Sequence, residues 1–340
     1  MQHQSADEED GNDREQHHLQ SERAVRHHKL PSQLRVNFTS HPSNRPADRP
    51  AATVDDLTGQ VKRAAIESGF DAVGICRSEV LRPERERYLS WLEEGRQGEM
   101  RWLTTEWART ASNPSDLLPG ANSVICVALS YAGVPTLETP SRSGRIARYA
   151  VGADYHSLVT DRLAGLVRRI GPLGGSTRSF VDTAPTMDKA LAARAGLGWQ
   201  GRNTNILSRE LGSFTFLGGI LTDLDLTPDL PAQPGCGSCR ACAVACPTGA
   251  LNGDYTIDAR LCISYLTIEH RGSIPRELRH LIGDWVFGCD ICQDICPPVT
   301  DLQDHEFPEL RSQRIAFTRA HMRQANVSSR PNSDGATRLV

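Results

Sequence analysis

Residues 236–247 read Cys-Gly-Ser-Cys-Arg-Ala-Cys-Ala-Val-Ala-Cys-Pro and decide the fold of the region that contains them. This is the C-x2-C-x2-C-x3-C-P run of bacterial ferredoxins. Its first three cysteines share one tight loop and can hold three corners of a [4Fe-4S] cubane. The fourth leaves on a helix after an extra residue and points toward a neighbouring cluster. One such run therefore predicts a second cluster nearby.

The second half of the pattern is present in an altered form. Residues 289–297 read Cys-Asp-Ile-Cys-Gln-Asp-Ile-Cys-Pro, but the position three before Cys289 holds Val286. Cys262, which lies 27 residues upstream of Cys289, is the one spare cysteine of this region and can supply the missing ligand. The crossed rule then assigns Cys236, Cys239, Cys242 and Cys296 to cluster one, and Cys246, Cys262, Cys289 and Cys292 to cluster two.

Zinc and disulfides are the other uses of clustered cysteines. Two zinc sites of four cysteines would also use all eight, but zinc ribbons favour paired C-x2-C hooks over a triple run that ends in Cys-Pro. A disulfide framework is typical of small secreted proteins, and the amino-terminal residues lack the apolar segment of a signal peptide. The spacing therefore favours reduced, iron-bound cysteines in the cytoplasm.

The composition limits the partners of the chain. The 340 residues carry a formal net charge of −3, which argues against a polybasic surface for nucleic acid. A local arginine patch remains open, because only Lys29, Lys62 and Lys189 are lysine. No stretch of 18 apolar residues occurs, so no membrane association is expected.

Composition and periodicity divide the chain into four segments. Residues 1–52 are polar and aperiodic, which predicts a disordered amino-terminal extension. Residues 53–228 alternate helix and strand patterns, which is typical of an α/β domain. Residues 229–300 form the two-cluster module. Residues 301–340 are polar again and are expected to be a short tail, truncated or disordered.

Apolar periodicity predicts the elements of the α/β domain. Helices are expected at residues 54–68, 82–94, 155–170 and 184–195, and strands at residues 70–76, 123–129 and 214–221. The strand at 123–129 is apolar throughout, as in a strand covered on both faces. Cys76 and Cys126 lie inside two of these strands and are expected to be small buried residues rather than ligands.

A glycine-rich string, Gly196-Leu-Gly198-Trp-Gln-Gly201, matches G-x-G-x-x-G. It follows a predicted helix, whereas a dinucleotide-binding fingerprint must follow a strand and open a helix, so a Rossmann site is rejected. We expect these glycines instead to let the backbone approach a bulky ligand closely.

Asp182 follows an apolar pair and precedes the helix predicted at 184–195, whose first turn holds Pro185. Two roles fit this position. Asp182 or Thr183 could cap the helix, or Asp182 could be a general acid. The pattern of residues leaves both roles open.

Several motifs, in this order, resemble the epoxyqueuosine reductase family. The resemblance covers residues 54–298 and is more specific than a cysteine run alone. The motifs are Leu118-Pro-Gly120, Arg148-Tyr-Ala150, Asp154-Tyr-His156, Val181-Asp-Thr-Ala-Pro185, Ala195-Gly-Leu-Gly-Trp199 with Asn203-Thr204, Gly212-Ser213, Leu217-Gly218, the run Asp258–Glu269 and Gly288-Cys-Asp290.

The resemblance implies an α+β protein, in which an α/β cobalamin-binding domain resembling nitroreductases is followed by a ferredoxin-like domain with two [4Fe-4S] clusters. It implies reduction of epoxyqueuosine to queuosine at the wobble position of tRNA, with cobalamin reduced through the clusters. The expected partners are tRNA carrying epoxyqueuosine and an external electron donor of the flavodoxin or ferredoxin type. We expect a cytoplasmic monomer.

The resemblance also implies site residues. In the family the Asp of the V-D-x-A-P motif is the proton donor, which corresponds to Asp182, and burial beside the macrocycle would raise the pKa of such an acid. From the residues alone, Arg271 and Arg276 flank a Gly and a Pro near the clusters and are candidates to pair with tRNA phosphates, and an ordinary solvated surface fits them equally well. Ala147 departs from many members, which have Ser or Cys there. Expected cobalamin contacts are Asp182, Arg202, Asn203, Thr204, Asn205, Ser264 and Asp290.

Two alternative functions are considered. A corrinoid-dependent reductive dehalogenase would share the cofactors, but usually carries an export signal. A non-catalytic two-cluster electron carrier would need the cysteines, but neither Asp182 nor a large ligand site.

Overall fold

A four-stranded sheet lies at the centre of the computed structural model, which describes residues 53–133 and 144–300. Its spatial order is β1-β2-β7-β4, and each neighbouring pair is antiparallel. All eight residues of β2 are buried, which confirms the expected strand covered on both faces. The strands are β1 (Ala72–Arg77), β2 (Ser123–Ser130), β4 (Thr177–Val181) and β7 (Thr215–Thr222).

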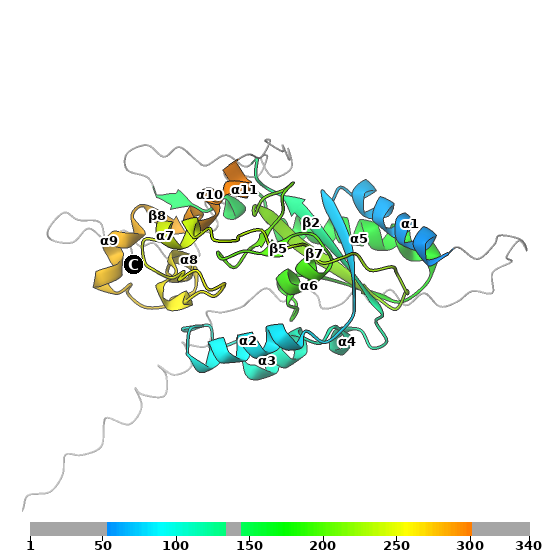
Figure 1. Ribbon diagram of the computed structural model, residues 1–340, viewed down its shortest axis with the longest axis horizontal. Coiled ribbons are helices and arrows are strands. Elements are labelled where there is room, and N and C mark those ends of the chain that lie inside the picture. Colours follow the sequence, from blue (N-terminus) through cyan, green and yellow to red (C-terminus); the bar gives the residue numbers. More distant parts are fainter. Residues whose placement is uncertain (1–52, 134–143, 301–340) are drawn as a thin grey trace, which may run out of the picture. The chain divides into compact units, whose positions relative to one another are not determined.

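Two helices, α1 (Val54–Glu67) and α5 (Tyr155–Ile170), cover one face of this sheet (Figure 1). The expected helix at 155–170 is confirmed at both ends. Side chains alternate along β2, so that Ile125 joins the core under α1 and α5 while Cys126 joins the core of the opposite face. The sheet is therefore sandwiched between two hydrophobic layers.

The opposite face is covered by α6 (Asp188–Arg194), which contacts β1, β2 and β7. Cys76 and Cys126 are both buried in this layer together with Leu191, as expected for small core residues. The hydrogen bond with the Cys76 thiol raises the pKa of the Cys126 thiol well above its usual range, and burial raises it further. The Cys126 thiol is therefore a neutral core group.

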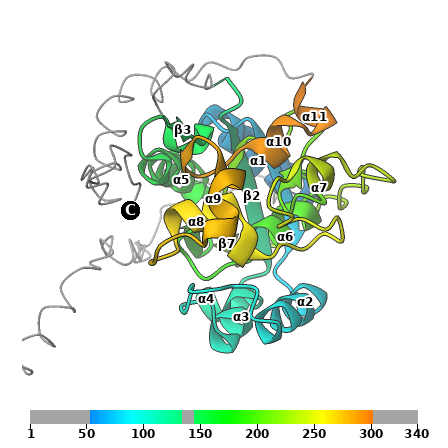
Figure 2. The same ribbon diagram turned by 90° about the vertical axis from the view of Figure 1, so that its left-hand side faces the viewer.

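A helical excursion connects β1 to β2. It consists of α2 (Arg82–Glu93), α3 (Thr105–Ala111) and α4 (Pro114–Leu117). The ring of Tyr88 on α2 lies 5.2 Å from that of Trp107 on α3, and this contact holds the two helices together. The three helices lie at the bottom of Figures 1 and 2, and α2 contacts the cysteine-rich module, where Trp91 Nε1 donates to Ile257 O at 2.6 Å.

The cysteine-rich module is built of short elements, shown facing the viewer in Figure 2. Its own core contains Ile263, Leu266, Leu278 and Trp285. Its elements are α7 (Ala241–Ala245), η3 (Ala259–Leu261), α8 (Ile263–Ile268), α9 (Arg276–Ile282), β8 (Trp285–Phe287), α10 (Ile291–Asp294) and α11 (Pro297–Thr300).

One small sheet joins this module to the preceding residues. The short strand β3 (Arg145–Ile146) pairs in parallel with β8, and Arg145 N donates to Asp284 O at 2.6 Å. The order of an α/β part followed by a cysteine-rich module confirms the expected α+β class. The predicted limits at residues 228 and 229 stay a prediction, and the segments 1–52 and 301–340 lie outside the described residues.

The glycine-rich turn leads into a hairpin of β5 (Trp199–Gln200) and β6 (Ile206–Leu207). A Cβ atom at Gly198 would lie 2.4 Å from the Leu207 carbonyl oxygen, and one at Gly201 would lie 2.6 Å from Leu207 Cδ1. The space that a side chain at Gly198 or Gly201 would take is filled by Leu207 of the same hairpin. The expected close approach of the backbone to a ligand stays a prediction.

The remaining described elements are two 3-10 turns that flank α5. They are η1 (Arg148–Ala150) and η2 (Gly171–Leu173). No helix within the described ranges is long and apolar enough to cross a membrane.

Candidate active site

The candidate site lies at the end of the sheet where β2 and β4 finish and β7 begins. Ser130 pairs with Thr215 there, and Val181 pairs with Gly218. Asp182 directly follows β4. The sequence of the antiparallel strands therefore brings Asp182 to the same edge as the first residues of α5.

Asp182 is held by two side chains from the first turn of α5. Tyr155 Oη donates a hydrogen bond to Asp182 Oδ2, and His156 Nε2 lies 3.0 Å from Asp182 Oδ1. The other ring nitrogen, His156 Nδ1, lies 2.7 Å from Asp154 Oδ1. His156 therefore bridges two carboxylates, and 40% of the Asp182 side chain remains exposed for a further partner.

The pKa values of this pair move apart. Burial alone would raise the pKa of Asp182, but hydrogen bonds from His156 and Tyr155 and the charge of His156 outweigh it and lower that pKa. The hydrogen bond to Asp182 raises the pKa of His156 to about 9, against the opposing effect of burial. At neutral pH the proton therefore resides on His156 and Asp182 is a carboxylate.

Two expectations for Asp182 are wrong. The helix α6 begins at Asp188, and its cap residue is Met187, so neither Asp182 nor Thr183 caps it. The residues from Thr183 to Met187 form a turn instead of the first helical turn expected around Pro185. The pKa of Asp182 is lowered rather than raised, because two donors reach its carboxylate. Asp182 nonetheless occupies the position of a group that exchanges a proton with His156.

Tyr155 and His156 were not predicted as functional groups from the sequence. Their signal was present, because Asp154 is the N-cap of α5 and accepts from His156 N at 3.0 Å. The two residues after an N-cap occupy the first turn of the helix, so their side chains lie at its N-terminus. Periodicity could not show that β4, some 25 residues later, ends beside the N-terminus of α5.

Aromatic rings line the route from this site to the cysteine-rich module. Tyr155 stacks on Phe216 with the ring centroids 4.2 Å apart, and Phe216 stacks on Tyr131 at 4.4 Å. Tyr149 meets Tyr155 edge-on at 6.3 Å and Phe287 of β8 at 6.2 Å. The site and the module therefore share one aromatic wall.

The cysteines of the module fall into two neighbourhoods. Burial raises the pKa of Cys296 to about 12, and the thiols that add to this effect are Cys236, Cys242 and Cys239. Burial also raises the pKa of Cys292, and nearby thiols raise it further. These thiols are Cys262, Cys289, Cys242 and Cys246. Apart from the link between Cys292 and Cys242, these neighbours match the two ligand sets that the crossed rule predicts.

Backbone N–H groups point at the cysteine sulfurs. Ala243 N donates to Cys242, Ser264 N and Tyr265 N donate to Cys262, and Ile291 N donates to Cys289, and each of these bonds favours the thiolate. The chemistry of this donor set fits iron–sulfur ligation, in which hydrogen bonds to the sulfurs stabilise negative charge. Ser264, an expected cobalamin contact, thus has its amide directed at a cysteine.

The stretch 202–205 links the two modules. Arg202 Nη2 donates to Gly237 O at 3.0 Å, and its guanidinium lies 4.7 Å from the centre of the Tyr255 ring. Asn203 Nδ2 donates to Cys292 O at 3.2 Å, and Lys189 Nζ donates to Asn205 Oδ1 at 3.0 Å. Thr204 has a positive φ of 66°. Their expected contact with cobalamin stays a prediction.

Asp290 is another bridge between the modules. It is only 1% exposed, and its carboxylate accepts from Arg148 N at 2.8 Å. Burial raises its pKa to about 6, while the backbone N–H of Arg148 lowers it. Its expected role at cobalamin also stays a prediction.

Four buried polar atoms in this part of the molecule have no hydrogen-bond partner among the described residues. They are Thr186 Oγ1, Ser213 Oγ, Trp199 Nε1 and Arg202 Nε. Thr186 and Ser213 belong to the segments that leave β4 and enter β7 at the site end of the sheet. Because buried polar groups are rarely left unpaired, these atoms fit a site that receives further polar groups.

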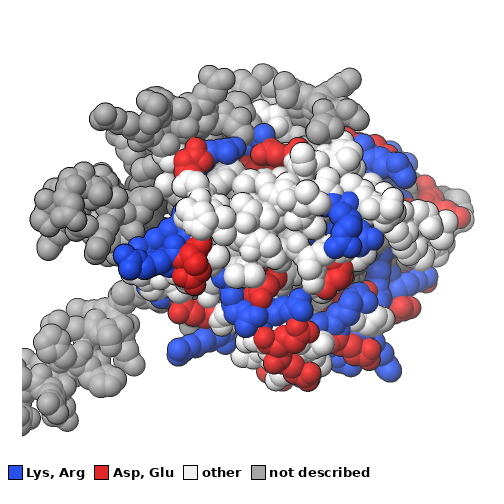
Figure 3. All heavy atoms as spheres, turned by 60° about the vertical axis from the view of Figure 1, so that its left-hand side comes forward, with Lys and Arg blue, Asp and Glu red and all other residues white. Residues whose placement is uncertain are grey.

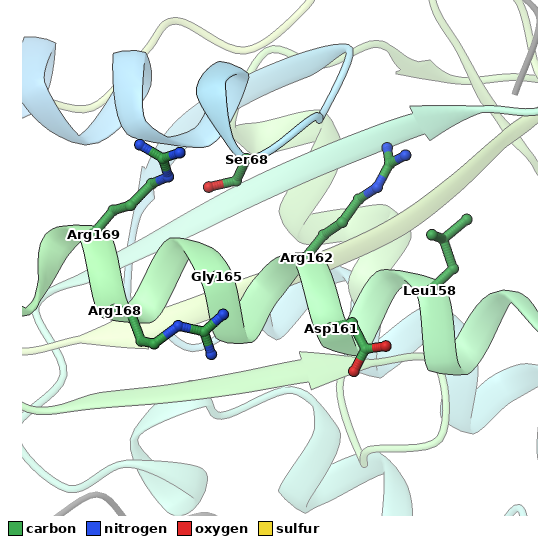
Figure 4. A pocket seen from close by; sticks show the side chains of 7 residues that line it. All are labelled: Ser68, Leu158, Asp161, Arg162, Gly165, Arg168 and Arg169. Carbon is green, nitrogen blue, oxygen red and sulfur yellow. The ribbon is translucent and has the colours of Figure 1, made fainter. Parts of the chain in front are cut away.

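A separate hollow lies on the outer side of α5, against the end of α1. Its volume is about 530 Å³. Figure 4 shows Arg162 and Arg169 reaching from α5 toward α1, where Arg169 Nη1 lies 2.9 Å from Glu67 Oε2. Arg162 donates to the Gly69 carbonyl oxygen. These arginines fasten α1 to α5, and the hollow lies apart from the candidate site.

Two family models match the chain. Residues 235–298 match the 4Fe-4S double cluster binding domain, which confirms the two expected [4Fe-4S] clusters over zinc. Residues 112–183, which end just past Asp182, match the model described as epoxyqueuosine reductase QueG, DUF1730.

Curated relatives of this chain are epoxyqueuosine reductases. That of Pseudomonas aeruginosa is 46% identical over 253 residues, covering 71% of this chain and 68% of the relative. That of Salmonella typhimurium is 45% identical over 251 residues, covering 72% of this chain and 65% of the relative. The chain thus spans slightly less than two thirds of the length of the Salmonella protein.

Solved structures of epoxyqueuosine reductases share the fold of this chain. A crystal structure of epoxyqueuosine reductase with an epoxyqueuosine-modified tRNA stem loop has 31% identity and a TM-score of 0.69, covering 76% of this chain and 69% of the other. The Bacillus subtilis enzyme, with its catalytic aspartate loop swung out of the active site, has 30% identity and a TM-score of 0.68 over the same shares.

Proposed function

We propose that this chain, which belongs to the epoxyqueuosine reductase family, reduces epoxyqueuosine to queuosine at the wobble position of tRNA. The observation that carries the proposal is the pair of Asp182 and His156 at the sheet end that faces the two-cluster module. Removing the epoxide oxygen as water takes two electrons and two protons. The clusters and bound cobalamin would supply the two electrons and the chemistry that breaks the carbon–oxygen bonds, and the chain would supply the protons.

His156 and Asp182 deliver the two protons in turn, because His156 takes up a proton from solvent after it has given the first. An alkoxide that leaves an epoxide is strongly basic and needs a proton as it forms. Asp182 is ionised at neutral pH, so it takes the proton from His156 Nε2, 3.0 Å from its Oδ1, and passes it to the leaving oxygen. Asp154 holds the opposite ring nitrogen and fixes the orientation of the imidazole. The exposed part of the Asp182 carboxylate faces the substrate.

The loop that carries Asp182 contains no helix or strand. Residues 182–187 lie between β4 and α6. The Bacillus subtilis relative has been seen with its catalytic aspartate loop swung out of the active site. We expect the same movement here, with Tyr155 and His156 as the contacts that hold Asp182 in place.

Each cluster is held by four cysteines of this chain. Cys236, Cys239, Cys242 and Cys296 bind cluster one, and Cys246, Cys262, Cys289 and Cys292 bind cluster two. The neighbourhoods of Cys296 and Cys292 support this division. Cys239 is exposed, which offers an external donor of the flavodoxin or ferredoxin type a point of close approach.

Cobalamin would be held between the α/β domain and the cysteine-rich module. The rim of its ring carries amide groups, which the unpartnered hydroxyls of Thr186 and Ser213 fit as partners. Its expected contacts are Asp182, Arg202, Asn203, Thr204, Asn205, Ser264 and Asp290.

The tRNA is the partner of the face that carries the module. Figure 3 shows that face with a large uncharged area, bordered by basic and acidic side chains of both signs. A field of mixed sign does not attract RNA over its whole extent, so recognition depends on individual arginines. Arg271 and Arg276, both exposed, are the proposed phosphate contacts. We propose that the enzyme acts as a monomer in the cytoplasm.

Anaerobic turnover of tRNA that carries epoxyqueuosine tests the function. Cluster-loaded and cobalamin-loaded protein should form queuosine, and no product from such a sample would contradict the proposal. Asp182→Asn should keep both cofactors and slow turnover by about 10²- to 10⁴-fold. The matched control is Asp161→Asn, on the outer side of α5, which should keep full activity.

A further inference from the structure

Trp199 carries a buried hydrogen-bond donor that the described residues leave unused. Its side chain is 6% exposed, and its indole Nε1 has no acceptor among them. An indole N–H can only donate, and when buried it usually has a partner. The partner of this one is therefore a group that binds to the protein.

The position of Trp199 identifies that group. The ring packs with Cys296 and Leu207, and Cys236 lies against the same cluster of side chains. A Cβ atom at Gly235 would lie 2.8 Å from Trp199 Cε2, the ring carbon bonded to Nε1. The ring atom nearest to that position is Cζ2, at 2.5 Å, so the Cζ2–Cε2 side of the indole, which adjoins the N–H, packs against the residue just before Cys236.

We propose that Trp199 Nε1–H donates a hydrogen bond to a sulfur of cluster one and raises the reduction potential of that cluster. The proposal rests on the ligand set assigned above, in which both Cys236 and Cys296 bind cluster one. A reduced cluster carries one more negative charge than an oxidised one. A donor aimed at its sulfurs therefore stabilises the reduced form.

Other features of the site support this role. The Arg209 guanidinium lies 5.6 Å from the centre of the Trp199 ring, on its face, and leaves the N–H edge free for the cluster. The backbone donors at Cys242, Cys262 and Cys289 show that the module already directs N–H groups at its sulfurs. Trp199 adds to them a donor from β5, outside the module.

Pulsed electron paramagnetic resonance of the loaded enzyme tests the bond directly. Protein with ¹⁵N in its indole rings is reduced until cluster one is paramagnetic. A ¹⁵N coupling is expected in the wild type and in Trp107→Phe, whose ring contacts Tyr88 away from the cysteines. The coupling should vanish in Trp199→Phe.

A redox titration supplies the second measurement. Phe keeps a ring in the pocket but has no donor, so Trp199→Phe should lower the ratio of reduced to oxidised cluster one about tenfold at a fixed potential. That is 59 mV for a one-electron couple. The Trp107→Phe control should titrate like the wild type.

The outcomes separate this inference from the proposed function. Wild-type protein with about eight iron atoms per chain but no ¹⁵N coupling would overturn the role of Trp199, whatever its activity. Because that measurement uses the unaltered chain, a folding defect of the variant cannot obscure it. Coupling without any queuosine product would leave the role of Trp199 standing and contradict the reductase.

Discussion

His156 Nε2 lies 3.0 Å from Asp182 Oδ1, and this contact keeps the proton on the imidazole rather than on the carboxyl. A buried carboxyl at an active site is often kept protonated by desolvation. Here the imidazole, itself held by Asp154, keeps the proton and the carboxylate stays charged. The acid of this site is therefore a pair rather than a single residue.

The pair predicts a loss of activity at high pH. His156 titrates at about 9, so turnover should fall as pH rises through 9. His156→Gln retains a hydrogen bond to Asp182 but cannot carry the extra proton, and it should slow turnover by about 10²-fold and remove that limb of the profile. Steady-state rates from pH 6 to 10 measure both. A limb that survives in His156→Gln would show that another group titrates.

The stability of the fold should follow the same titration. The pKa of His156 in the folded chain, about 9, is above its ordinary value of 6.5. Its contribution to the free energy of unfolding is therefore complete below pH 6.5 and is lost as pH rises through 9. Thermal unfolding of the wild type and of His156→Gln, compared at pH 6 and pH 9.5, should differ more at pH 6. An equal difference at both values would contradict the shift.

The features of the fold and site that could be predicted from the sequence are those that depend on local patterns. The cysteine spacing is a property of one loop and its helix, and the apolar run of β2 and the period of α5 depend only on neighbouring residues. Asp182 could be singled out, but its partners could not. They come from α5, and only the antiparallel pairing of β4 with β7 brings the end of β4 to them.

The errors have physical reasons of the same kind. Pro185 suits the first turn of a helix, yet the residues before Asp188 turn instead, because Asp182 is drawn to Tyr155 and His156. The pKa of Asp182 depends on those same two donors, which no local pattern reveals. The close packing of Leu207 against the glycine-rich turn is likewise a contact across the hairpin, which no local pattern reveals.

The assignment of Cys262 to cluster two predicts a selective loss of iron. Cys262→Ala should reduce the iron content from about eight to about four atoms per chain and leave the signal of cluster one, because the two clusters share no ligand. Cys126→Ala is the matched control, since Cys126 is buried in the sheet layer, and it should retain all the iron. Iron analysis and the spectrum of the reduced protein check this. A Cys262→Ala protein with full iron would place the fourth ligand elsewhere.

The close contact between Gly198 and Leu207 predicts that a side chain at Gly198 destabilises the fold. A methyl group there would lie 2.4 Å from the Leu207 carbonyl oxygen, so Gly198→Ala should lower the free energy of unfolding by about 1–3 kcal/mol. Gly171→Ala is the control, because nothing lies within 4 Å of its Cβ position, and it should be neutral or slightly stabilising. The midpoint of thermal unfolding of each loaded protein measures the effect. Equal midpoints would mean that the hairpin yields without cost.

Tyr155 predicts a change in the acidity of Asp182 that leaves the fold intact. Tyr155→Phe removes the hydroxyl that donates to Asp182 Oδ2, while the ring still stacks on Phe216 at 4.2 Å. One of the bonds that lower the pKa of Asp182 is then lost, so the carboxyl should take up its proton at a higher pH than in the wild type. Tyr131→Phe is the matched control, because Tyr131 stacks on the same Phe216 ring at 4.4 Å. Carbon-13 resonances of labelled aspartate, followed from pH 2 to 7 and assigned with Asp182→Asn, report the titration. If the resonance of Asp182 titrates alike in all three proteins, the Tyr155 hydroxyl does not hold the carboxylate, and His156 alone sets its charge.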